Sequence, residues 1–171
     1  MAMLASIARG IDSISTGIGK AAAWLIIPNV LALVYEFIAR YVVGSPTNWS
    51  YEVTYFLYGS HFLLGAAYAL SIKAHIRIDI FYQRFSPRLQ AIIEIIGYLF
   101  FFFPAVGLLV YAGAEFTIQS FEMGEKSGLS PWRPYLYPYK AVVLSAIFFL
   151  FLQGVAEFIK NLELAGKRKA I

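Results

Sequence analysis

The stretch SIKAHIRIDIF, residues 71–81, places ionisable side chains at every second position directly after a long apolar run. These side chains are Lys73, His75, Arg77 and Asp79. His75 and Asp79 are four residues apart and would share one face of a helix, but one histidine and one aspartate are too few ligands for a metal site. Because the stretch falls where the apolar run ends, we predict a structural elbow in which Asp79 pairs with Arg77, His75 or the later Arg84.

Glu36 and Arg40 are ionisable residues within an apolar run, where such residues indicate function by default. Their four-residue spacing, with the acid first, favours an ion pair on one helix face. Two interpretations remain open for Glu36. Either Arg40 neutralises the charge of Glu36, or Glu36 serves as a proton site or a link to another helix.

Other polar residues in apolar runs have structural interpretations. Glu52 falls in the first turn of an expected helix that Asn48 or Ser50 would cap, and an acid there suits the helix dipole. His61 is expected to bond a neighbouring carbonyl or tyrosine rather than a haem, and Glu157 precedes Lys160 by three residues, which favours a local pair.

Composition identifies an integral membrane protein. Of the 171 residues, 60% are hydrophobic and 14% are charged, whereas soluble domains carry about 25% charged residues. The absence of cysteine excludes disulfides and thiolate chemistry, and a net charge of +4 is too small and scattered to indicate nucleic-acid binding. No phosphate-binding loop, metal-ligand cluster or nucleophile with a base is found, so we predict no enzyme activity and no cofactor.

The elements that position these residues are predicted to be all α-helical, in a single membrane domain over residues 1–171. Four transmembrane helices are expected, at about 21–43, 51–72, 89–120 and 139–160, after a short N-terminal amphipathic helix on the membrane surface. The third is longer than a bilayer core requires, and Pro104 predicts a kink within it.

Basic residues predict that both termini are cytoplasmic. The side that holds the termini carries Arg9, Lys20, Lys73, Arg77, Arg84, Arg88, Lys160, Lys167, Arg168 and Lys169. The other side carries only Arg40, Lys126, Arg133 and Lys140. The loops 44–50 and 121–138 would then face outward.

Three local patterns at matching spacing resemble one family, the small membrane subunit (DctQ type) of tripartite ATP-independent periplasmic (TRAP) transporters. NWSYE opens the second span, AHIRIDIF follows it, and SGLSPWRPYLYPYKAVVLSAIFFLFLQGVAEFI enters and fills the fourth. The resemblance covers essentially the whole chain.

The resemblance implies a multi-pass subunit of the bacterial inner membrane without a substrate site of its own. Its implied partners are a large elevator-type membrane subunit, which takes up organic acids with sodium, and a periplasmic substrate-binding protein. The small subunit would brace the large one within the lipid bilayer and contribute to docking of the binding protein. For that outer contact we predict Trp49, Glu52, Trp132 and Arg133.

Two alternatives stay open at this point. A membrane anchor of a redox complex would bind haem or quinone. A self-sufficient small transporter would work as a homodimer, with Glu36 as its proton site.

Overall fold

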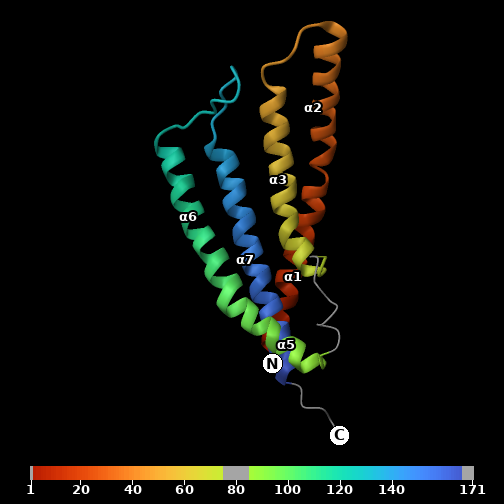
Figure 1. Ribbon diagram of the computed structural model, residues 1–171, viewed down its shortest axis with the longest axis vertical. Coiled ribbons are helices and arrows are strands. Elements are labelled where there is room, and N and C mark those ends of the chain that lie inside the picture. Colours follow the sequence, from red (N-terminus) through yellow and green to blue (C-terminus); the bar gives the residue numbers. More distant parts are fainter. Residues whose placement is uncertain (1, 75–84, 167–171) are drawn as a thin grey trace.

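The computed structural model describes residues 2–74 and 85–166, and the regular structure within them is helical apart from one isolated bridge. The elements in chain order are α1 (Ala2–Ala23), α2 (Ile26–Ile38), the π-helical segment η1 (Ala39–Val43), α3 (Ser50–Ser71), α5 (Pro87–Gly97), the π-helical segment η2 (Tyr98–Phe102), α6 (Phe103–Glu122) and α7 (Tyr137–Gly166). The predicted all-α class is confirmed. Helices α2, α3, α7 and α6 lie side by side, and the loops that follow η1 and α6 share one end of the bundle (Figure 1). We call this the loop end.

The N-terminal helix differs from the predicted surface helix in length and in position. α1 has 22 residues, and only two residues separate it from α2, so that Met3–Val43 forms a nearly continuous run of 41 residues. Its inner face carries Ala8, Ser15 and Ala22, each at most 3% exposed, and packs against α3 and α7. Short side chains at seven-residue spacing let the backbones approach closely. They therefore bring α1 into the bundle instead of leaving it apart on the surface.

The antiparallel packing of the α1–α2 run against α3 is held by polar contacts as well as by small residues. Ser50 Oγ donates to the carbonyl of Ala32 at 3.0 Å, and His61 Nδ1 lies 2.9 Å from the carbonyl of Ala22. The predicted bond from His61 to a carbonyl is confirmed. In a chain that buries few large side chains, such interhelical bonds fix the register of the helices.

The third helical run, residues 87–122, is continuous through α5, η2 and α6. Pro104 has no backbone N–H, so the regular ladder is interrupted, and the π-helical segment lies directly before the proline. The run changes direction between α5 and α6, in agreement with the predicted kink (Figure 1).

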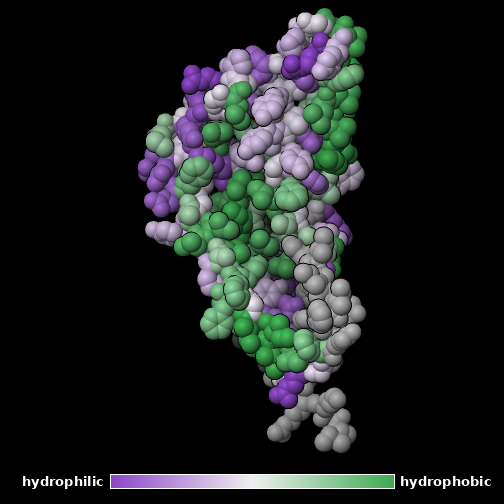
Figure 2. Space-filling model, viewed as in Figure 1, coloured by the Kyte–Doolittle hydropathy of each residue, from purple (hydrophilic) through white to green (hydrophobic). Residues whose placement is uncertain are grey.

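Three helices among the described residues are long and apolar enough to cross a membrane: Met3–Val43, Pro87–Glu122 and Tyr137–Gly166. The predicted helix at 51–72 exists as α3, one residue earlier, but it is more polar than these three. In Figure 2, hydrophobic surface covers the α2 edge and the lower part of α6, whereas hydrophilic side chains gather toward the loop end. The chain is therefore a multi-pass membrane protein with at least one helix of mixed polarity.

Candidate functional site

Glu36 joins α2 to the loop that leads into α3. Its Oε1 accepts a bond of 2.9 Å from Arg40 Nε, and its Oε2 accepts bonds from the hydroxyl and the backbone N–H of Thr47, at 2.5 and 3.1 Å. Thr47 Oγ1 in turn accepts from the backbone N–H of Ser50 at 3.3 Å. The geometry confirms the predicted contact between Glu36 and Arg40, and it places both carboxylate oxygens in hydrogen bonds.

The start of α3 is built differently from the prediction. Trp49 occupies the N-cap position and its side chain caps nothing, while Ser50 is already inside the helix. The hydroxyl of Thr47 reaches the first turn instead, and the Trp49 ring stacks on Tyr35 with 5.7 Å between ring centroids. The cap is therefore neither Asn48 nor Ser50. Glu36 holds the Thr47 hydroxyl in place, and this hydroxyl accepts the bond from the first turn of α3 instead.

Glu52 is completely buried in the first turn of α3. Its Oε1 accepts a bond of 2.9 Å from Ser130 Oγ, which belongs to the loop between α6 and α7. Its Oε2 has no hydrogen-bond partner among the described residues. Glu52 thus connects two loop-end segments that lie 78 residues apart in the sequence.

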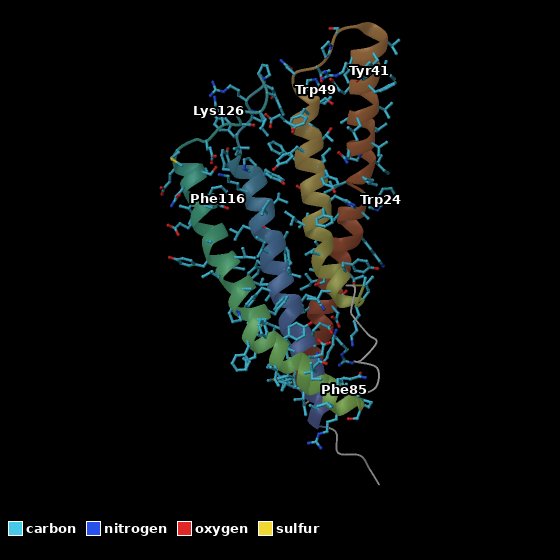
Figure 3. The ribbon with its side chains drawn as sticks, viewed as in Figure 1. Trp24, Tyr41, Trp49, Phe85, Phe116 and Lys126 are labelled. Atoms are coloured by element: carbon cyan, nitrogen blue, oxygen red, sulfur yellow. The ribbon has the colours of Figure 1, made fainter. Side chains whose placement is uncertain are left out.

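The second loop is ordered as a hairpin over residues 125–136. Lys126 and Tyr135 form an antiparallel bridge, and backbone bonds flank it, from Ser127 N–H to the Pro134 carbonyl at 2.8 Å and from Leu136 N–H to the Glu125 carbonyl at 2.9 Å. Its tip exposes the side chains of Leu129, Pro131, Trp132 and Arg133. Arg133 adopts a φ of 48°, and Trp49 and Lys126 mark the two loop-end segments in Figure 3.

An ion pair fixes the base of the hairpin to α7. Lys140 Nζ donates to Glu125 Oε2 and lies 3.4 Å from the centroid of the Phe116 ring on α6. The hydrogen bond from Lys140 holds the pKa of the Glu125 carboxyl below its ordinary value of 4.5. The hairpin is therefore attached to α3 through Glu52 and to α7 through Glu125.

A second polar cluster lies between α1 and α7, at the end of the bundle opposite the loops. Asp12 Oδ1 accepts from Gln153 Nε2 at 2.8 Å and from Lys160 Nζ at 2.7 Å, and Lys160 Nζ also donates to Glu157 Oε1 at 2.6 Å. Gln153 and Glu157 are buried. The pair of Glu157 and Lys160 was predicted, but the participation of Asp12 was missed. The spacing of Gln153, Glu157 and Lys160 shows that they share one helix face, yet no sequence signal identifies the helix they meet.

The remaining predicted site residues, His75, Arg77 and Asp79, lie outside the described residues, so the elbow stays a prediction. Trp132 is 45% exposed and Arg133 is exposed, as a contact surface requires. In residues 2–74 and 85–166, no three His, Asp or Glu side chains converge as metal ligands would.

The comparison with protein families identifies the family of this chain, which the geometry alone cannot do. A family model described as "Tripartite ATP-independent periplasmic transporters, DctQ component" matches residues 29–164, well over half of the chain. The chain belongs to the DctQ family. No curated protein matches it. The family match covers the loop-end segments, α7 and the hairpin, and it confirms the resemblance seen in the sequence motifs.

As a DctQ component, the chain is a small subunit of a TRAP transporter and works together with other subunits. Both loop-end segments that carry Trp49, Glu52, Trp132 and Arg133 lie within the matched region, whereas all of α1 precedes it.

Proposed function

We propose that this chain is the scaffold subunit of a sodium-coupled TRAP transporter for organic acids, without a substrate site of its own. It braces the large elevator-type membrane subunit and offers the loop end to the periplasmic substrate-binding protein. One observation carries the proposal. The acidic groups Glu36 and Glu157 within the long apolar helices are bonded to Arg40, Thr47 and Lys160 of the same chain, as structural links and not as open ion sites.

The topology we propose has four crossings with both termini in the cytoplasm. The Met3–Val43 run ends at the loop end, and residues 87–122 start from the opposite end (Figure 1). α3 connects these two ends and is about 33 Å long at 1.5 Å per residue, enough for a bilayer core of about 30 Å. The excess of basic residues on the terminal side supports the orientation in the bacterial inner membrane.

The hairpin tip is the part we assign to docking of the binding protein. Bonds from Ser130 to Glu52 and from Lys140 to Glu125 restrain the hairpin before any partner arrives. A restrained segment loses less conformational entropy on binding, and Trp and Arg are the residue types most often responsible for binding energy. Leu129, Trp132 and Arg133 together fit such a contact.

The test is the affinity of the assembled membrane complex for its binding protein. Trp132→Ala is expected to weaken binding by about tenfold or more, which corresponds to about 1.4 kcal/mol. Tyr111→Ala, which changes a side chain that is 71% exposed on α6 and away from the loop end, is the matched control and should leave the affinity unchanged. Equal affinities for the Trp132 variant and the native complex would refute docking at the hairpin.

A further inference from the structure

The outward side of α3 carries a line of exposed aromatic side chains. Tyr51, Tyr55, Tyr58 and Phe62 follow one another at i, i+4, i+7 and i+11 and therefore form a single line along the helix, which we call the α3 stripe. Their exposed fractions are 63%, 47%, 58% and 66%. We propose that the α3 stripe is the contact surface for a transmembrane helix of the large membrane subunit, an inference that rests on the proposed function.

The other sides of α3 are already occupied. Ser50, His61 and Tyr68 meet the α1–α2 run, and Gly59 is so close to α7 that an added Cβ would lie 2.0 Å from the Tyr139 hydroxyl. The stripe is the remaining side, and only Tyr55 at its edge also lies against α7, with 5.6 Å between the centroids of its ring and that of Tyr139.

The polarity of the stripe is poorly matched to lipid. α3 is not among the three helices apolar enough to face a bilayer, although it lies between α2 and α7, which are. Tyrosine suits the headgroup level, but the stripe extends for about 16 Å along the helix, which is more than one level. In hydrocarbon, a hydroxyl gains most from a hydrogen bond to another helix. A protein partner therefore fits this face better than acyl chains do.

Two cavities flank the stripe and give a partner side chains room to interlock. One of about 300 Å³ separates α2 from α3, and one of about 350 Å³ lies below the hairpin between α3, α6 and α7. Tyr55 lines both, so they lie on the two sides of the stripe. Thr54, which lines the first, has a buried hydroxyl without a hydrogen-bond partner among the described residues.

Beyond Phe62, the residues on the same side of α3 are small. Gly65, Ala66 and Ala69 follow, and a Cβ added to Gly65 would meet nothing within 4 Å. Small residues at an exposed helix face let a second helix approach closely, which is the usual driving force for association in membranes. The bulky aromatic residues nearer the loop end and the small residues beyond Phe62 make this side of α3 uneven. An uneven surface can interlock with a partner helix, as a packed interface requires.

The occupant we assign is the large membrane subunit because the surface lies alongside membrane-spanning helices. Because α3 crosses the bilayer in the proposed topology, Tyr58 and Gly65 would lie within the membrane, away from a binding protein outside it. A second copy of this chain would bring two stripes of the same tyrosines together. Lipid and a second copy are the outcomes that would contradict the assignment.

The experiment uses photo-crosslinking in membranes that contain the complete transporter. The crosslinking residue p-benzoylphenylalanine replaces Tyr58 in one sample and, as control, Leu108, which is 70% exposed on α6. The Tyr58 position should give an adduct with the large subunit, identified by mass, at about tenfold or more the yield from Leu108. Equal yields, an adduct with a second copy, or adducts with lipid alone would overturn the inference.

A second variant keeps the result interpretable. A Cβ added to Gly65 or to Gly17 would meet nothing within 4 Å, so Gly65→Leu adds bulk next to the stripe and Gly17→Leu, on the exposed face of α1, is the matched control. Gly65→Leu should lower the amount of large subunit that co-purifies by about fivefold or more, with the melting temperature of the isolated chain unchanged. If native chain and large subunit do not co-purify at all, the proposed function fails. If they co-purify and both variants behave alike, only the α3 assignment fails.

Discussion

Glu36 and Glu157 are acidic residues in apolar helices, and each meets a base on its own helix, at i+4 and i+3. These contacts were predictable because they depend on spacing alone. The third residue that joins each pair could not be predicted. Thr47 reaches Glu36 from the following loop, and Asp12 reaches Lys160 from 148 residues away. Side chains that meet through tertiary packing leave no periodic signal in the sequence.

The contact between α1 and α7 depends on Lys160, which neutralises two carboxylates. Lys160→Met would leave Asp12 and the buried Glu157 without their shared cation, although Gln153 still donates to both. Loss of a charged partner from a buried acceptor costs about 1–3 kcal/mol, so the melting temperature in detergent should fall. Arg40→Met is the matched control. It removes a base that is 51% exposed, and it should lower the melting temperature less.

A double variant separates charge from packing in this cluster. Lys160→Met combined with Glu157→Gln removes the buried negative charge together with its partner. It should therefore be more stable than Lys160→Met alone. If the double variant melts at the lower temperature of the two, the cluster does not act through charge neutralisation.

The bond between Glu125 and Lys140 makes the stability of the hairpin depend on pH. Because the pKa of folded Glu125 lies below its ordinary value of 4.5, this carboxyl stabilises the fold above that pH. The contribution is lost as the pH falls through the lowered, folded pKa. The difference in melting temperature between native chain and Glu125→Gln should be constant near neutral pH and shrink in acid. A difference that grows in acid would contradict the assigned ion pair.

At the scale of the elements, sequence periodicity located every helix that the structure describes, but not how α1 packs. The second predicted span is displaced by one residue from α3, and the kink near Pro104 is present. The apolar residues of α1 suggested contact with a membrane surface. Its packing instead follows from Ala8, Ser15 and Ala22, whose small size is informative only when the facing helix is known.

Two glycines of α1 provide a matched test of this packing. A Cβ added to Gly19 would lie 2.3 Å from the Tyr68 Cβ, which cannot move without its backbone, whereas one added to Gly17 would meet nothing within 4 Å. Gly19→Ala should cost about 1–3 kcal/mol through overpacking, and Gly17→Ala should gain about 0.5–1 kcal/mol through helix propensity. Thermal unfolding in detergent measures both. Equal melting temperatures for the two variants would show that α1 does not pack on α3 as described.

At the scale of the whole molecule, the family and the membrane class were accessible from motifs and composition, and the family match confirms the former. The connection between the two loop-end segments was not accessible, because a bond such as that from Ser130 to Glu52 joins residues far apart in the chain. The loop end is consequently one restrained surface instead of two independent loops. That surface and the α3 stripe give the chain two separate faces, which suits a subunit that holds other subunits together.

The most direct test of the central claim is uptake into proteoliposomes under an inward sodium gradient. A panel of radiolabelled organic acids is first screened with the complete complex, which serves as the positive control. The acid that the complete complex takes up is then used for the test. Our account predicts uptake when this chain, the large subunit and the binding protein are all present, and none when this chain is reconstituted alone. Uptake by this chain alone would contradict the assignment of a scaffold subunit.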